Sequence, residues 1–216
     1  MIFDVLDRVD ALNLSEHLKP RVVGDWQIDY YNLTTEHIQV LKLRDDIHSS
    51  DELSGQREGI VVRLRNGDTT VMSDTAMERR TNTPFFLNAK GDILIAGLGL
   101  GVIIMPIQDL PEVKSITVIE RSSAVIELVT TQLPLNDKVT VIYDDIFKWK
   151  PKRRTRYDTI YFDIWDAICG DYYEAMRLLR KRFRTYKRDK DSWLGHWREE
   201  DMRIAARRWG NFFSHL

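Results

Sequence analysis

Residues 91–101 read Gly-Asp-Ile-Leu-Ile-Ala-Gly-Leu-Gly-Leu-Gly, an apolar run that ends in three alternating glycines. The run Ile93–Ala96 is typical of a strand buried on both faces of a parallel sheet. Gly97, Gly99 and Gly101 then permit a tight turn and a close approach of the backbone to a ligand. We therefore predict a strand, a ligand-binding turn and a helix over residues 102–110.

Apolar strands and helical segments alternate after this turn, which is the pattern of a parallel sheet covered by helices. The sequence predicts a helix between the second and third strands of this sheet, and after residue 171 it predicts only helix. The sheet is therefore expected to end after its fourth strand. The predicted strands after the first are 115–119, 139–143 and 157–162, and the predicted helices are 122–133, 171–186 and 191–216.

An antiparallel hairpin is predicted ahead of the sheet, because Asn66-Gly67 separates two alternating segments and this pair favours a type I′ turn. Further expectations for this region are a helix over 2–10, strands at 21–23 and 26–30, and a loop over 49–59. The resulting division is an accessory region over 1–83, a binding core over 84–186 and a helical cover over 187–216.

Acidic residues follow the last three predicted strands of the sheet. Glu120 ends the second strand, Asp144 and Asp145 follow the third, and Asp163 and Asp166 follow the fourth. Ligands of open parallel sheets bind at the carboxyl ends of the strands, where these groups and the glycine turn are expected to meet. Glu120 lies twenty-three residues after Gly97, a spacing that suits a carboxylate accepting the two hydroxyls of a ribose.

These segments resemble the core of the class I S-adenosylmethionine (AdoMet)-dependent methyltransferases, a Rossmann-like α/β fold, over about residues 84–185. The resemblance implies AdoMet as the cofactor, with the glycine turn at its methionine portion, Glu120 at its ribose and either Asp144 or Asp145 at its adenine. The implied cofactor-binding residues are Gly97, Leu98, Gly99, Gly101, Glu120, Arg121, Asp144, Asp145, Ile146 and Asp163.

One branch of that superfamily is especially similar. Spermidine synthases carry a hairpin ahead of the core and Asp-x-x-Asp after the fourth strand, as in Asp163-Ile-Trp-Asp166 here. The resemblance implies Asp163 and Asp166 as catalytic residues that hold and deprotonate an acceptor. Leu98 in the glycine turn departs from the spermidine synthase pattern, and Arg79 and Arg80 disfavour a polycation. We therefore predict methyl transfer to an unidentified acceptor; the alternatives are aminopropyl transfer and a non-catalytic nucleoside-binding or assembly module.

Charge divides unevenly along the chain, although its net charge is −1. Residues 1–147 hold 14 basic and 23 acidic residues, whereas residues 148–216 hold 18 basic and 10 acidic residues. The stretch 148–156 and a helical stripe concentrate the basic side chains, which could follow phosphates or form a solvated face. The acceptor stays unidentified, and a small amine and a nucleic acid are both compatible with the sequence. The stripe consists of Arg177, Arg180, Lys181 and Arg184.

Other classes of protein are disfavoured by the composition. The single cysteine, Cys169, excludes an internal disulfide framework, and neither a secretory signal nor a run of about 20 apolar residues for a membrane span is present. The five histidines lack metal-ligand spacing, so no metal site is expected. We expect a cytoplasmic enzyme without a membrane partner, whose uncovered sheet edge is shielded by the terminal helices or by a second subunit in a homo-oligomer.

Overall fold

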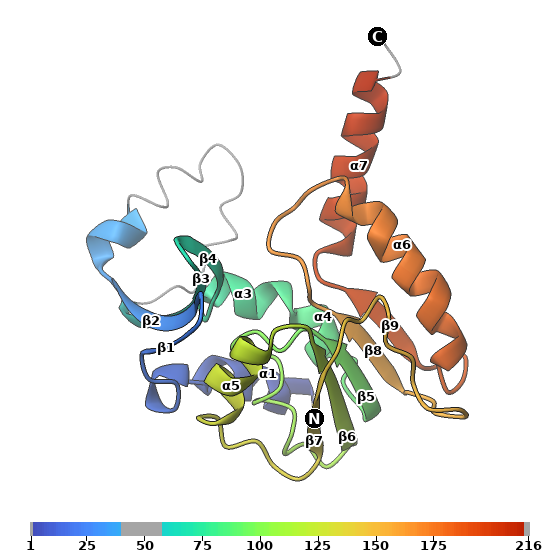
Figure 1. The fold of residues 1–216 in the computed structure, drawn as a ribbon, viewed down its shortest axis with the longest axis horizontal. Coiled ribbons are helices and arrows are strands. Elements are labelled where there is room, and N and C mark those ends of the chain that lie inside the picture. Colours follow the sequence, from blue (N-terminus) through green and yellow to red (C-terminus); the bar gives the residue numbers. More distant parts are fainter. Residues whose placement is uncertain (1, 40–57, 214–216) are drawn as a thin grey trace.

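The computed structural model describes residues 2–39 and 58–213, which form two sheets. A four-stranded antiparallel sheet has the order β1-β2-β3-β4, and a five-stranded parallel sheet has the order β7-β6-β5-β8-β9. Figure 1 shows the two sheets side by side, with α3 (Ala76–Thr81) and α4 (Thr83–Phe86) as the link between them. The architecture is therefore the mixed α/β fold with a Rossmann-like sheet that we predicted.

The antiparallel sheet confirms the predicted hairpin, with a shifted turn. Asn66 pairs with Thr69, so Gly67 and Asp68 form the loop, and Gly67 has a φ of 55°. Glycine at the first of two loop positions is the type II′ pattern. The amide of Gly67 also donates to the carbonyl of Asp25 at 2.8 Å, which ties this turn to the preceding hairpin.

The N-terminal elements match the predicted helix and strands. They are α1 (Ile2–Ala11), η1 (Leu14–Glu16), β1 (Arg21–Val23), β2 (Trp26–Leu33), β3 (Gly59–Asn66) and β4 (Thr69–Ser73). The predicted loop over 49–59 lies outside the described residues, except for its last two positions.

The parallel sheet contains the four predicted strands and one more. The predicted four are β5 (Gly91–Ala96), β6 (Val113–Glu120), β7 (Val139–Tyr143) and β8 (Thr159–Phe162). β9 (Trp193–His196) pairs with β8 at a position where we predicted helix, so the expectation that the sheet ends after four strands was wrong. A strand of four residues has too few alternations to produce a period that sequence reading can detect.

The helices around the parallel sheet also differ from expectation at one place. The predicted helix over 102–110 was wrong, because this segment is a series of turns. Ile103, Ile104 and Ile107 are all buried, and Pro106 lacks the amide that a helix interior requires. α5 (Ser123–Thr130) is confirmed; Ser122 caps it by accepting a hydrogen bond from the Val125 amide at 3.3 Å.

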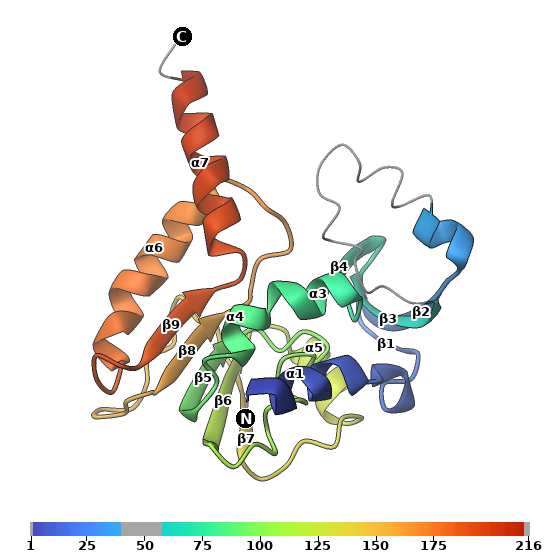
Figure 2. The ribbon, with the colours of Figure 1, turned by 180° about the vertical axis from the view of Figure 1, so that it is seen from behind.

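The C-terminal helices are α6 (Tyr172–Phe183), followed by η2 (Arg184–Tyr186), and α7 (Glu199–Phe213). The first part of α7 packs on the body of the molecule, where Met202 is buried in the core, and Figure 2 shows the last turns of the helix extending beyond α6. Within residues 2–39 and 58–213, no helix is long and apolar enough to cross a membrane.

One apolar core joins the two sheets. Val5 of α1 and Leu64 of β3 belong to the same buried cluster as Ile95 of β5 and Phe162 of β8. The hairpin sheet is thus packed onto the parallel sheet, and the two share the walls of the site described next. The division at residues 83 and 186 stays a prediction.

Candidate functional site

A cavity of about 440 Å³ lies at the carboxyl edge of the parallel sheet. The turns after β5, β6, β7 and β8 line one side of it, and the antiparallel sheet, α3 and the start of α6 line the other. The predicted site residues that line the cavity are Gly97, Leu98, Gly99, Glu120, Arg121, Asp144, Asp145, Ile146, Asp163 and Asp166. Gly101 does not line the cavity, because it lies against Leu133 on the far side of the glycine turn.

The glycine turn fits tightly against its neighbours. Gly97 has a φ of 97°, and a Cβ at this residue would overlap the backbone carbonyl oxygen of Asp163. Only glycine therefore brings the first turn of the site this close to the end of β8. On the opposite side, the Leu100 amide donates to Sδ of Met72 at 3.3 Å, so the hairpin also contacts the turn.

Glu120 is 9% exposed and is fixed by two backbone amides. Its Oε2 accepts a hydrogen bond from the Leu98 amide at 2.9 Å, and its Oε1 accepts one from the Ser122 amide at 2.8 Å. Each carboxylate oxygen has two acceptor positions, so both oxygens keep one for a ligand. The arrangement gives a rigid pair of acceptors directly beside the glycine turn.

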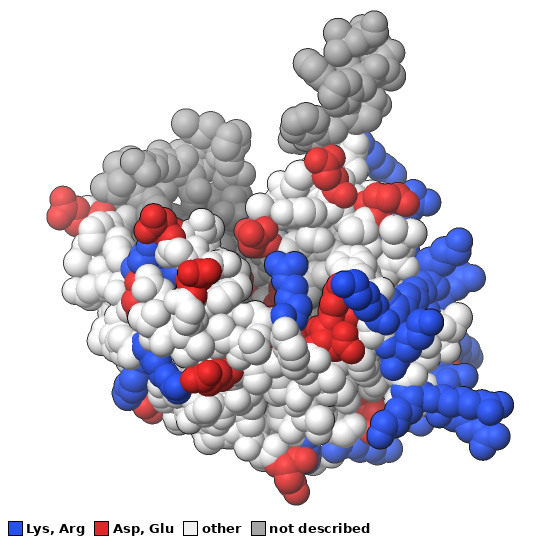
Figure 3. All heavy atoms as spheres, viewed as in Figure 1, with Lys and Arg blue, Asp and Glu red and all other residues white. Residues whose placement is uncertain are grey.

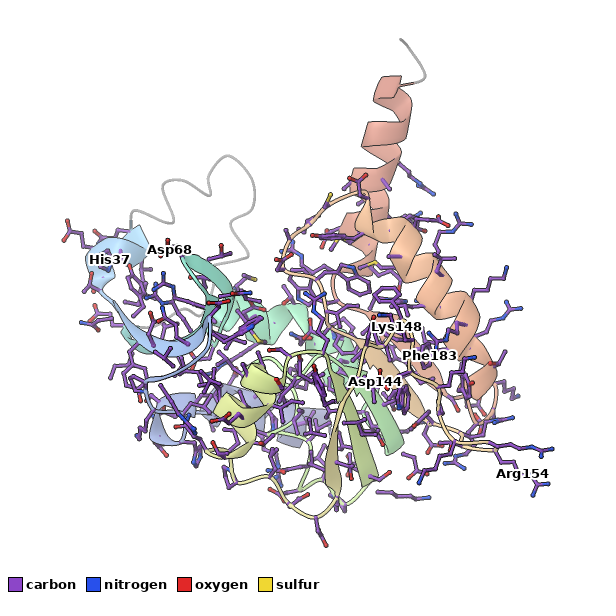
Figure 4. The ribbon with its side chains drawn as sticks, in the orientation of Figure 1. His37, Asp68, Asp144, Lys148, Arg154 and Phe183 are labelled. Atoms are coloured by element: carbon purple, nitrogen blue, oxygen red, sulfur yellow. The ribbon has the colours of Figure 1, made fainter. Side chains whose placement is uncertain are left out.

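The two aspartates after β7 differ in what their side chains already bind. Asp145 accepts a hydrogen bond from the Phe147 amide at 2.9 Å, and its second oxygen lies 3.7 Å from Nζ of Lys148. Asp144 accepts one hydrogen bond, from the Asp145 amide at 2.7 Å. Figure 4 shows Asp144 and Lys148 near each other at this end of the sheet. Of the two, Asp144 has the more available carboxylate.

A second acid meets Asp163 across the cavity, and the sequence analysis missed it. Glu78 of α3 lines the same cavity as Asp163. Burial raises the pKa of Asp163 to about 7. Burial, and after it the charge of Asp163, raises the pKa of Glu78 to about 8. Carboxyl groups with pKa values near neutrality are typical of proton-transfer sites.

Arg79, next to Glu78 in the sequence, faces away from the cavity. Its Nη1 donates to the carbonyl of Val9 at 2.9 Å, and its Nε donates to the carbonyl of Asp74 at 3.2 Å. This guanidinium joins α3 to the end of α1 and does not line the cavity. The expectation that Arg79 would repel a cationic acceptor is therefore wrong.

The remaining wall combines acidic and aromatic groups. The charge of Asp166 raises the pKa of Tyr172. The hydroxyl of Tyr172 lies 3.5 Å from Oδ1 of Asp166. Trp165 and Trp197 add apolar surface, and Nε1 of Trp197 donates to Thr81 of α3 at 3.0 Å. These contacts give the cavity a rigid aromatic side.

Charge in the cavity is strongly one-sided. The acidic lining residues are Glu78, Glu120, Asp144, Asp145, Asp163 and Asp166, whereas Arg121 is the one basic residue among the described lining residues. Such a lining favours a ligand that carries positive charge. Among the described residues, no group of three His, Cys, Asp or Glu side chains is arranged to hold a metal ion.

Comparison with known proteins shows similarity only among solved structures. No protein-family model matches the sequence, and no curated protein matches it. The plantazolicin methyltransferase BpumL, solved in complex with SAH, is 24% identical over 45% of this chain and 35% of its own length, with a TM-score of 0.36. This chain thus spans about a third of that protein.

Two further structures cover more of the chain. N-methyltransferase NodS from Bradyrhizobium japonicum WM9, solved with S-adenosyl-L-homocysteine, is 17% identical over 62% of this chain and 66% of its own, with a TM-score of 0.44. Spermidine synthase from Thermotoga maritima is 14% identical over 90% of this chain and 63% of its own, with a TM-score of 0.42. The chain is similar in fold to these two methyltransferases and to this spermidine synthase.

Proposed function

We propose that this protein binds AdoMet in the cavity and transfers the methyl group to an amine. The observation that carries the proposal is the Glu120 carboxylate, which two backbone amides hold directly beside the glycine turn. A fixed pair of acceptors at this strand end suits the two hydroxyls of a ribose. The acidic lining in turn suits a positively charged sulfonium.

Other lining residues are placed to contact the adenine and the methionine portion of the donor. Asp144 is the better partner for the amino group of adenine, because Asp145 already holds the turn after β7. Ile146, which is buried beside them, offers an apolar surface to the ring. Gly97 and Leu98 would face the methionine portion, next to Asp163.

In this proposal, Asp163 orients the acceptor, and Asp163 or Glu78 accepts its proton. When bound, the donor supplies an electrophilic methyl carbon on a positively charged sulfur. Asp163 orients the acceptor nitrogen for in-line attack, so that the new N–C bond forms as the C–S bond breaks and its electron pair stays on sulfur. The carboxylate of Asp163 or Glu78 then accepts the proton that the nitrogen loses. Their pKa values of about 7 and 8 suit a base that works near neutral pH.

Aminopropyl transfer is the second candidate, and the charge of the cavity supports it. AdoMet carries a carboxylate on its methionine portion, and Arg121 is the one described lining residue that could pair with it. Decarboxylated AdoMet lacks this group and carries a larger positive charge. Glu120, Asp144, Asp145 and Asp166 favour such a donor on electrostatic grounds, whereas the raised pKa values of Asp163 and Glu78 leave those two groups partly protonated near neutral pH.

Calorimetric titration with AdoMet, S-adenosylhomocysteine and decarboxylated AdoMet tests both candidates. We expect AdoMet and S-adenosylhomocysteine to bind, and Glu120→Ala to weaken both at least ~10-fold, which corresponds to about 1.4 kcal/mol. Glu127→Ala is the matched control, because Glu127 lies on α5 and pairs with Arg21 outside the cavity. Preference for the decarboxylated donor would select aminopropyl transfer.

A measurement of methyl transfer to amine acceptors distinguishes an enzyme from a non-catalytic binding module. The non-catalytic alternative would be supported if the protein bound the donor but transferred its methyl group to no amine, and if Asp163→Asn left donor binding unchanged. Absence of binding by all three nucleosides would refute the proposed donor site.

A further inference from the structure

A group of exposed cations lies on the side of the molecule formed by the β7–β8 loop and α6. We define the basic surface as Lys150, Lys152, Arg153, Arg154, Lys181 and Arg184. Figure 3 shows Lys and Arg side chains gathered on this side, and Figure 4 places Arg154 at its outer end. Lys148 connects the surface to the cavity rim through its ion pair with Asp145.

The loop and the helix form one continuous surface because Arg182 joins them. Its guanidinium donates to the carbonyls of Ile146 at 3.0 Å and Phe147 at 2.6 Å, and also to that of Trp149. The Trp149 ring stacks on Phe183 of α6, with centroids 6.5 Å apart and planes 10° apart. The cations after Trp149 are thereby held beside Lys181 of α6 and Arg184 of η2.

Neighbouring acids do not neutralise this surface. Arg177 and Arg180 of α6 pair with Glu174 and Glu199, respectively. By contrast, the six residues of the basic surface form no ion pair within residues 2–39 and 58–213. Residues 148–156 hold six cations and no acid. Uncompensated cations this close together attract a polyanion more strongly than a face of alternating charge does.

Two exposed aromatic residues lie just before the cations of the β7–β8 loop in the chain. Tyr143, the last residue of β7, is 66% exposed, and Phe147 is 47% exposed. Lys148 follows Phe147 directly, so the rings and the cations form one path along the chain. Aromatic rings next to a basic groove are how proteins bind single-stranded nucleic acid without sequence preference.

We propose that this face binds a single-stranded nucleic acid, with the phosphates on the basic surface and the bases on Tyr143 and Phe147. The acidic cavity repels phosphates, so the backbone of the strand passes outside it. The inference goes beyond the proposed transferase activity and does not depend on it.

Fluorescence anisotropy with labelled 20-nucleotide oligouridine and oligothymidine tests this binding between 50 and 200 mM salt. The affinity is expected to fall with salt, and the double variant Lys152→Ala/Arg153→Ala should reduce the slope of log K against log salt by about 1.4, or 0.7 for each lost cation. Lys19→Ala/Arg21→Ala removes the same two residue types at the start of β1, where Lys19 donates to the carbonyl of Ser15 and Arg21 pairs with Glu127, outside the basic surface. This control should retain the wild-type slope.

Tyr143→Ala tests the stacking part of the proposal. We expect a loss of at least ~5-fold in affinity with an unchanged salt slope, because base stacking is worth about 1–3 kcal/mol per base. The residue is exposed and does not line the cavity, so donor binding should be unaffected. The proposal is overturned if duplexes bind better than single strands, if phosphatidylserine vesicles bind and oligonucleotides do not, or if the basic-surface double variant binds like wild type.

Discussion

The two sheets supply the cavity in different ways. The parallel sheet supplies backbone turns and carboxylates at successive strand ends, with Glu120 and Asp163 as its central groups. The antiparallel sheet and α3 supply side chains from across the cavity, among them Met72 and Glu78. The parallel sheet forms one side of the cavity because its strands end at the same edge. The antiparallel sheet and α3 complete the cavity by packing against that edge. A change in the first region should therefore disturb the fold, and a change in the second should tune the site.

The largest effect is expected from Gly97→Ala in the parallel sheet. The new Cβ would overlap the Asp163 carbonyl at a φ of 97°, and strain plus overlap should cost about 3–5 kcal/mol of the free energy of unfolding. Gly24→Ala in the antiparallel sheet is the control, because Gly24 has a φ of 58° and open space around its Cβ position. Its cost should be about 1–2 kcal/mol.

Urea unfolding of both alanine variants measures this difference. Equal losses of stability would show that the close approach of the glycine turn to β8 contributes nothing beyond backbone strain.

An intermediate effect is expected from the acids that face each other across the cavity. Asp163 and Glu78 have ordinary pKa values of 3.8 and 4.5 and folded values of about 7 and 8. At a pH between the ordinary and the folded pKa values, the folded chain therefore binds more protons than the unfolded chain. The free energy of unfolding should fall as the pH rises from about 4 to 8, and then level off. Asp163→Asn and Glu78→Gln should each flatten this decline.

Urea unfolding at intervals between pH 5 and pH 9 provides the measurement. Asp68→Asn is the control, since its side chain is fully exposed on the hairpin turn and should leave the decline unchanged (Figure 4). A wild-type stability that rises over this range would contradict the raised pKa values.

The smallest effect is expected from Met72→Leu, at the contact between the hairpin and the glycine turn. The substitution keeps the volume of the side chain but removes the sulfur that accepts the Leu100 hydrogen bond. The loss of stability should be about 0.5–1 kcal/mol, with faster hydrogen exchange of the Leu100 amide. Met176→Leu in α6, a buried methionine of the same core, should leave that amide unchanged. Unaltered exchange in both variants would show that the thioether does not hold the turn.

Sequence reasoning worked best where local pattern and topology agree. The apolar run Ile93–Ala96, the glycines after it and the acids Glu120 and Asp163 could be placed together because strands of a parallel sheet end at one edge. It failed for residues 102–110, because a segment buried on all sides has no helical period. It also failed for β9, where four residues are too few to show a period.

The sequence by itself determined the positions of four strands along the chain, the glycine turn and the carboxylates at the strand ends, since each of these features depends on residues close together in the chain. Only the tertiary structure decided that Glu78 meets Asp163, that Arg79 turns away toward α1, and that β9 extends the sheet. These contacts join segments far apart in the chain. Their partners are chosen by how whole surfaces pack, which no local pattern of residues encodes.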